Sequence, residues 1–198
     1  MRLKNFRAMT VLFVLFGCMW SNAHAQNEHG IALSTLPRQF TATAFGQSGS
    51  MTGKSFGFDF YITAWTTDEQ VHSFVGTLKE KGPDAPVKAM AKASEVGRSS
   101  PTGYVGSSFS FARYTPTANG GLHIVLASDR PMSFVEVYHG TRSRDYPFGI
   151  AVLDVDKDGK GTGTLAPMCK IRFNKKEELE IEHFGQKPFR LANVNLQK

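Results

Sequence analysis

The feature that most constrains this chain is a strict alternation of apolar and polar residues from Phe56 to Thr63. Phe56, Phe58, Phe60 and Ile62 occupy every second position, and Gly57, Asp59, Tyr61 and Thr63 lie between them. Successive side chains of a β-strand point to opposite faces, so this pattern predicts a strand with one apolar face and one solvent-exposed face. Such a strand needs neighbours to bury its apolar face, which favours a fold built on sheets.

Similar alternation recurs along the chain between glycine-containing turns. It predicts further strands in the segments 40–45, 109–113, 122–126, 133–139, 148–155, 163–173, 179–183 and 188–196. Asp158-Gly159 between two of them is a strong hairpin signal. We expect a mainly β (α+β) fold, an antiparallel barrel or sandwich of about eight to nine strands. The period alone leaves both forms open, and the barrel is slightly preferred.

One segment changes to a helical period. Thr67 and Gln70 have the spacing of a capping box, and Val71, Phe74, Val75 and Leu78 repeat at i, i+3, i+4 and i+7. This predicts a helix over 67–81, ended by Gly82-Pro83, and a shorter second helix from Asp84. We expect an inserted helical hairpin near residues 67–93, covering the sheet face that carries Tyr61 and Trp65. The alternative is that these two aromatic residues line a ligand surface.

The first 25 residues have the three parts of a secretory signal peptide: a basic start, an apolar run and the small-residue site Ala23-His24-Ala25. We expect cleavage after Ala25, a poorly ordered lead-in over 26–37 and one β-rich domain over 38–198. Lipid attachment at Cys18 is the alternative, although bulky Phe16 does not suit such a site. The apolar run is shorter than a membrane-spanning helix needs, so no transmembrane anchor is expected.

Charge and cysteine content narrow the function classes. Cleavage removes three of 23 basic residues and none of the 17 acidic ones, which lowers the net charge from +6 to +3. We therefore expect a periplasmic or secreted protein that does not bind nucleic acid, because the chain has no basic stripe. Only Cys169 remains after cleavage, so no intramolecular disulfide is expected.

Asp154, Asp156 and Asp158 match the first half of a calcium-binding loop, where alternate carboxylates converge on one ion. The twelfth position from Asp154 is Leu165, where such a loop requires a bidentate glutamate. A solvated hairpin turn explains the segment better, and whether it binds calcium stays open.

No set of residues in the sequence has the spacing of a catalytic, cofactor or metal site. The histidines His29, His72, His123, His139 and His183 are too scattered for a local zinc site. We expect His183 to face the interior or its mouth as a hydrogen-bonded histidine. Cys169 is expected to be buried and inert.

A polar segment over 141–146 contains Arg142, Arg144 and Asp145. Together with Arg113 and Asp129-Arg130 it offers guanidinium groups that can receive an anion at one rim. A solvated loop with an internal ion pair is the preferred interpretation, since exposed pairs of this kind are common and weak.

Several pieces of the chain resemble an uncharacterised family of exported bacterial β-rich proteins. The resemblance lies in ITAWTTDE at 62–69, ASDRPMSF at 127–134, DYPFGIAVLDVDKDGKGTGTLAP at 145–167 and LEIEHFG at 179–185. It spans most of the chain from Phe40 onward and implies a bacterial, exported, β-rich protein. That family has no established activity, so the resemblance assigns no role to any residue.

Three functions are compatible with these patterns. The leading one is an exported module that binds a small apolar, amphipathic or lipid-like ligand. The second is an envelope protein-interaction or structural module. The third is a hydrolase whose site is assembled only by the fold, with His183, His123 and Asp59 as the groups to follow. Ligand, partner and oligomeric state stay open.

Overall fold

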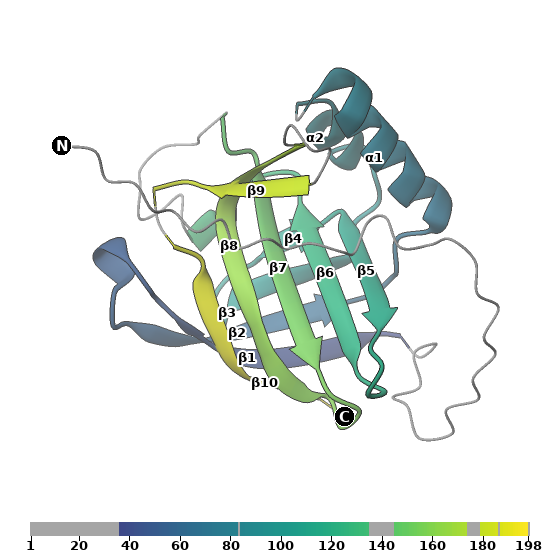
Figure 1. Cartoon of the computed structure of the whole chain (residues 1–198). Coiled ribbons are helices and arrows are strands. Elements are labelled where there is room, and N and C mark those ends of the chain that lie inside the picture. Colours follow the sequence, from purple (N-terminus) through teal and green to yellow (C-terminus); the bar gives the residue numbers. More distant parts are fainter. Residues whose placement is uncertain (1–35, 83, 135–144, 174–178, 186, 198) are drawn as a thin grey trace.

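The computed structural model describes residues 36–82, 84–134, 145–173, 179–185 and 187–197 (Figure 1). Ten strands and two α-helices are present in this part of the chain. The strands are β1 (Arg38–Phe45), β2 (Ser55–Ile62), β3 (Gly97–Pro101), β4 (Ser107–Phe109), β5 (Phe111–Pro116), β6 (Leu122–Ser128), β7 (Phe148–Val155), β8 (Lys160–Phe173), β9 (Leu179–His183) and β10 (Phe189–Leu196). The helices are α1 (Asp68–Lys81) and α2 (Asp84–Met90), and the turn before β2 contains the short 3-10 helix η1 (Gly49–Met51).

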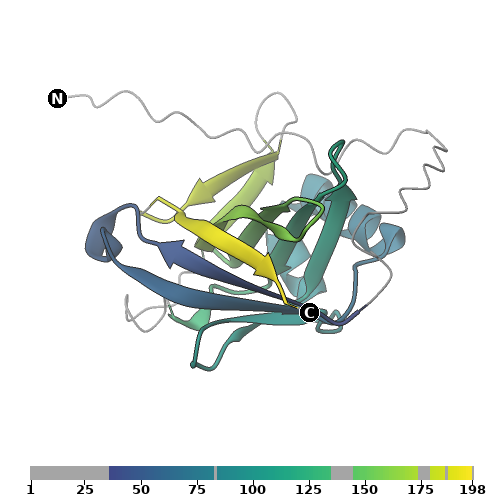
Figure 2. The same cartoon turned by 90° about the horizontal axis from the view of Figure 1, so that it is seen from below.

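All ten strands belong to one antiparallel sheet in the order β4-β3-β2-β1-β10-β8-β7-β6-β5, with β9 paired to the far part of β8. Strands β1 to β3 cross β5 to β8 at a steep angle (Figures 1 and 2). The two end strands β4 and β5 are consecutive in the chain, and the Ser110 N–H between them donates to the Ala127 carbonyl at 3.1 Å. The sheet therefore curves into a nearly closed barrel, which confirms the predicted fold class.

The barrel interior is filled by the apolar faces of its strands. The alternation that began the prediction holds, because Phe58, Phe60 and Ile62 of β2 are fully buried and Asp59 and Tyr61 are not. Strands from every side of the barrel add further large side chains with almost no exposed area, among them Phe40, Phe109, Leu122, Ile124, Leu126, Leu153 and Leu165. The centre of the barrel is thus a packed core.

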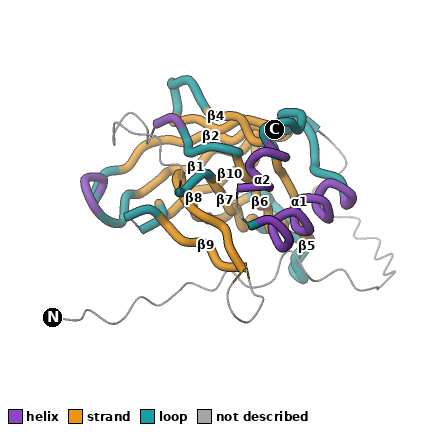
Figure 3. The backbone as a smooth tube through the Cα atoms, turned by 90° about the horizontal axis from the view of Figure 1, so that it is seen from above, coloured by secondary structure: helices purple, strands orange, loops and turns teal. Residues whose placement is uncertain are grey.

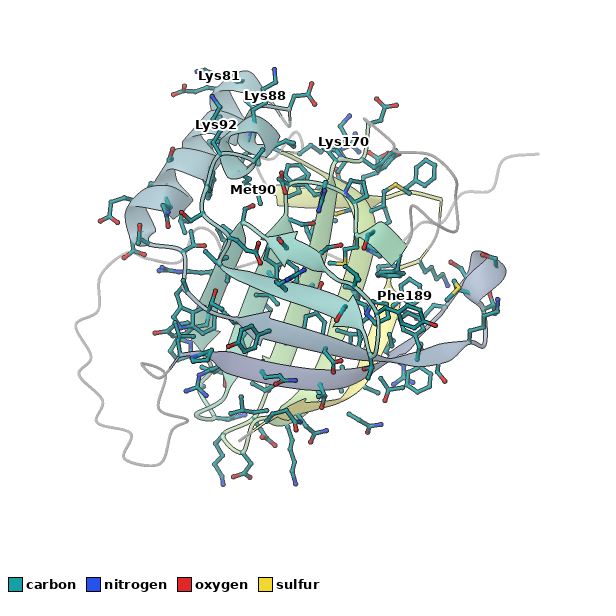
Figure 4. The ribbon with its side chains drawn as sticks, turned by 180° about the vertical axis from the view of Figure 1, so that it is seen from behind. Lys81, Lys88, Met90, Lys92, Lys170 and Phe189 are labelled. Atoms are coloured by element: carbon teal, nitrogen blue, oxygen red, sulfur yellow. The ribbon has the colours of Figure 1, made fainter. Side chains whose placement is uncertain are left out.

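Both helices lie against the outer face of β5 to β8 and enclose a second apolar layer (Figure 3). Thr67 caps α1: its Oγ1 accepts from the Gln70 N–H at 3.3 Å, and the Gln70 side chain accepts from the Thr67 N–H at 2.9 Å. Met90 of α2 lies between the hairpin and the strands, whereas Lys88 and Lys92 project from the hairpin (Figure 4). The predicted capping box and helical hairpin are confirmed.

The predicted partner face of the hairpin is wrong. Tyr61 is 42% exposed, and Trp65 packs with the barrel core, its ring 4.8 Å from that of Tyr114 on β5. The reason lies one residue before the cap, where Thr66 Oγ1 accepts from the Ala112 N–H of β5 at 2.9 Å. This bond directs the start of α1 across β5 instead of back over β2.

Three strand predictions need correction. The segment 97–101 was not among the expected strands, because GRSSP lacks apolar alternation, but it pairs with the edge of β2 and forms β3. The expected strand 109–113 is divided at Ser110, where the chain changes direction between β4 and β5. Phe109 therefore lies in the barrel core and Phe111 in the apolar layer under the helices. Ser133 and Phe134 are helical, while the rest of the expected strand 133–139 is outside the described residues.

Residues 1–35, which contain the expected signal peptide and most of the lead-in, also lie outside the described residues. Strand β1 begins at Arg38, where the β-rich domain was expected to start. Among the residues that the structure describes, no helix has the length and apolar character that crossing a membrane requires.

Candidate functional site

The three carboxylates of the calcium-like segment do not converge. Asp156 closes the turn, since its Oδ1 accepts from the backbone N–H groups of Asp158 and Lys160, both at 2.9 Å. Asp158 pairs with Lys157 at 3.2 Å, and Asp154 lies on the outer face of β7 beside His123. Each carboxylate therefore has a different partner, and the segment is a hairpin turn stabilised from within.

His123 and Asp154 form the closest histidine–carboxylate pair in the described residues, with 2.5 Å between Nδ1 and Oδ1. They are cross-strand neighbours on β6 and β7, and the next residue across on β5 is Thr115. The His123 Nε2 atom is buried and has no hydrogen-bond partner among the described residues. The carboxylate thus orients the imidazole, as in many catalytic sites, but the described hydrogen bonds join no hydroxyl or thiol to it.

The three groups named for a hydrolase lie on strands that are not neighbours. Asp59 is on β2, His123 on β6 and His183 on β9. The structure therefore does not bring them together through the sheet, and the acidic partner of His123 is Asp154.

His183 and Cys169 face each other across β9 and β8, at the edge of the layer under the helices. Cys169 has no exposed area, and burial raises the pKa of its thiol far above the usual range. His183 is half-buried with no partner for Nδ1, and burial lowers its pKa. A neutral imidazole beside a protonated thiol does not form the ion pair that activates cysteine nucleophiles.

Of the arginines expected at one rim, Arg113 has partners of its own. Arg113 on β5 donates to the Asp68 carboxylate at the start of α1 and to the Thr66 carbonyl. Arg142 and Arg144 lie outside the described residues. Because Arg113 is bound to Asp68 and Thr66, it does not support an anion site in this group.

The barrel has two chemically different ends. At one end, Phe134 from the connection after β6 packs its ring against the core rings of Phe56, Phe58 and Phe189, with centroids 5.6–5.9 Å apart. Neighbouring residues hold this connection, since the Ser133 N–H donates to Ser107 Oγ at 2.9 Å. Four aromatic rings thus meet at this Phe134 end.

The opposite end carries a charge. Arg38 begins β1 on the same face as Phe40, so its side chain extends toward the barrel core, and the residue is only 7% exposed. Trp65 and Tyr114 contact each other there, and Tyr114 is close enough to Arg38 to affect its pKa. We call Arg38, Trp65 and Tyr114 the Arg38 cluster.

Burial dominates the electrostatics of this cluster. Removal of the guanidinium from water lowers the pKa of Arg38, and the nearby Tyr114 partly opposes the shift. The indole N–H of Trp65 is also buried, and it donates to no acceptor in the part of the chain that the structure describes. An unsatisfied buried donor costs about 1–3 kcal/mol, so an acceptor placed here recovers that cost.

Partly buried apolar residues border the cluster. Leu36 precedes Arg38 by two positions, Ala64 follows its cross-strand partner Ile62 by two, and both pack against the core together with Trp65 and Tyr114. This end therefore combines buried donors with partly exposed apolar surface, the two properties that small-molecule sites share.

The sequence contained a signal for this cluster that the prediction did not use. Arg38 lies in phase with Phe40, Ala42 and Ala44, so its position indicates an inward-facing charge. Trp65 was instead expected under the helical hairpin, with a ligand surface as the alternative. Tyr114 follows the corner at Ser110, and that change of direction was not expected.

Comparisons with models of protein families, with curated proteins and with solved structures found no match for this chain. Within the described residues, no three His, Cys, Asp or Glu side chains come close enough to hold a metal ion together.

Proposed function

We propose that this protein is an exported binding module for a small amphipathic ligand, and that the ligand binds at the Arg38 end of the barrel. The observation that carries the proposal is the Arg38 cluster, which combines the buried side chain of Arg38 with apolar side chains and with the indole N–H of Trp65, a donor that has no acceptor among the described residues. Buried donors at an apolar surface orient a ligand and provide specificity.

The packed interior supports a site at the end of the barrel instead of in its centre. Phe40, Phe60 and Leu126 have no exposed area, so a ligand in the centre would have to displace core side chains. Displacement of even one such side chain costs several kcal/mol of packing. At the Arg38 end, Leu36, Trp65 and Tyr114 are only partly buried and offer contact area without that cost.

Export is the part of the proposal that rests on the sequence. The basic start, the apolar run and Ala23-His24-Ala25 support cleavage after Ala25 and a periplasmic or secreted protein, with lipid attachment at Cys18 as the alternative. N-terminal sequencing of the protein recovered from the periplasm or medium tests it. A chain starting at Gln26 supports the proposal, and one that retains Met1 contradicts it.

Native mass spectrometry of the recovered protein tests ligand binding. We expect a mass above that of the chain from Gln26 that disappears on denaturation, with the released molecule having an apolar body and a polar head. The Arg38→Gln variant should lose most of this excess, and the exposed Arg98→Gln variant should keep it. A bare chain in every preparation contradicts ligand binding.

A second candidate, a protein-interaction module, is supported by the loop between β3 and β4. Tyr104 and Val105 at its tip are 77% and 85% exposed, and glycines flank both. Exposed apolar residues at a loop tip occur at protein interfaces, although two residues are a small patch. Co-purification of a partner that the Tyr104→Ser/Val105→Ser variant fails to retain would favour this function.

A further inference from the structure

We propose that the Phe134 end of the barrel docks on an anionic lipid surface, with the tip of the loop between β3 and β4 inserted among the head groups. This inference goes beyond the proposed function, because the ligand site is at the opposite, Arg38 end and neither site needs the other.

Three segments that connect strands lie beside the aromatic rings of the Phe134 end. Residues 45–55 lead from β1 into Phe56 of β2, and residues 187–190 contain Phe189 at the start of β10. Residues 101–107 connect β3 to β4 and begin opposite β2. We call these three segments the end segments.

Printed contacts hold the end segments together. The Lys187 N–H donates to Ser48 Oγ at 2.6 Å, which joins the segment before β10 to the segment before β2. The Thr102 N–H donates to the Gly57 carbonyl at 2.9 Å, which joins the segment after β3 to the start of β2. Lys54 lies three residues before Gly57, so its charge is close to this last segment.

The charge of the end segments has one sign. They contain Lys54, Lys187 and Arg190, and no acidic residue. Since the chain from Gln26 has a net charge of +3, its other residues are neutral on balance. The three basic residues are exposed, and none forms an ion pair with a carboxylate among the described residues. These segments therefore offer positive charge to an anionic partner.

The loop between β3 and β4 adds an apolar tip. Tyr104 and Val105 are the two most exposed of the large apolar side chains in the described residues, at 77% and 85%. The Tyr104 N–H donates to the Pro101 carbonyl at 3.0 Å, and Gly103 has a φ of 84°, so the chain makes a tight turn here. Both side chains project from that turn into solvent.

The shape and chemistry of this tip favour a bilayer over a protein. A stable protein interface buries about 800 Å² on each partner, far more than two side chains supply. A bilayer accepts a projecting tip without a complementary shape. Tyrosine is enriched at the head-group level of membranes, and nearby lysine and arginine residues are attracted to anionic lipids. The end segments supply both features together.

Flotation of the recovered protein with lipid vesicles tests the inference. Vesicles of phosphatidylcholine mixed with phosphatidylglycerol are compared with vesicles of phosphatidylcholine alone. We expect binding to the anionic vesicles to be about ten- to a hundredfold tighter, since each basic residue near an anionic bilayer contributes about fivefold. High salt should remove most of this difference, because it screens exposed charges.

A charge variant and a matched control connect the binding to this end. Lys54→Gln/Lys187→Gln should weaken binding to anionic vesicles about tenfold or more. The control, Lys157→Gln/Lys160→Gln, removes the same charge from the turn between β7 and β8, at the other end of β10. It should leave binding close to that of the unaltered protein.

A second variant tests the tip. Tyr104→Ser/Val105→Ser keeps every charge and should weaken binding to anionic vesicles about ten- to a hundredfold, because the apolar side chains no longer enter the bilayer. Binding that this variant leaves unchanged overturns insertion of the tip.

The remaining outcomes are also decisive. Protein that floats with neither kind of vesicle overturns the inference, and capture of a protein through Tyr104 and Val105 in that case favours the protein-interaction module. Equal weakening by the charge variant and its control also overturns it, because the protein then binds through net charge alone. None of these results affects ligand binding at the Arg38 end, which Arg38→Gln tests separately.

Discussion

Individual buried polar groups determine how this protein responds to its solution conditions. Arg38 and Cys169 are buried and His183 is half-buried, and burial shifts the pKa of each in the direction that favours its neutral form. For Cys169 and His183 the neutral form then dominates under ordinary conditions, and two measurable consequences follow.

The pH dependence of stability should contain a contribution from His183. Burial lowers its pKa below the ordinary value of 6.5, so below pH 6.5 the unfolded chain binds a proton that the folded chain does not. The free energy of unfolding should therefore be highest above pH 6.5 and decrease as the pH falls below it. Urea denaturation at several pH values should show a smaller decrease for His183→Gln, with exposed His72→Gln as the control. Equal decreases in both variants would contradict this role.

The Cys169 thiol should be unreactive in the folded protein. It has no exposed area, and its raised pKa leaves almost no thiolate at pH 8. A chain starting at Gln26 should react with a disulfide reagent such as DTNB at least a hundredfold more slowly without urea than in denaturing urea, because the reagent must wait for unfolding. Equal rates under the two conditions would show that the second apolar layer opens freely.

At the scale of elements, sequence patterns predicted the strands and the helix whose formation depends on neighbouring residues. Apolar alternation located β2, β7 and β9, and the capping box at Thr67 placed α1 to within one residue. β3 was missed because its sequence carries no apolar period, and it becomes a strand through pairing with β2. The corner at Ser110 was missed because both Phe109 and Phe111 are buried, but in different layers. The strand with which a segment pairs, and the apolar layer that its side chains enter, both depend on segments far away in the sequence.

The turn before β8 should tolerate no side chain at Gly159. This residue has a φ of 74°, and an added Cβ would lie 2.5 Å from the Leu196 Cβ. We expect Gly159→Ala to lower the free energy of unfolding by about 1–3 kcal/mol in urea denaturation.

Gly76 provides the matched control for Gly159. It lies inside α1, and an added Cβ would meet no atom within 4 Å. Gly76→Ala should therefore raise the free energy of unfolding by about 0.5–1 kcal/mol. A similar loss in both variants would indicate that neither position behaves as the geometry requires.

At the scale of the whole molecule, the barrel class was predictable and its functional end was not. Strand density and turns indicated an antiparallel barrel or sandwich, and the structure shows a nearly closed barrel. The Arg38 cluster joins β1, the segment after β2, and β5. Only closure of the sheet brings β5 to the start of β1, because β1 and β5 are far apart in strand order. The periodicity of a single sequence cannot show that Tyr114 of β5 comes close to Arg38 of β1.

The central claim is that ligand binds at the Arg38 end. The most direct test is the indole N–H resonance in a ¹⁵N-labelled chain starting at Gln26, which should give one tryptophan signal, from Trp65. We expect this signal to shift on addition of the molecule released in native mass spectrometry. The shift should be lost in Arg38→Gln. A bound ligand that leaves the Trp65 resonance unmoved would contradict the claim and place the site elsewhere on the molecule.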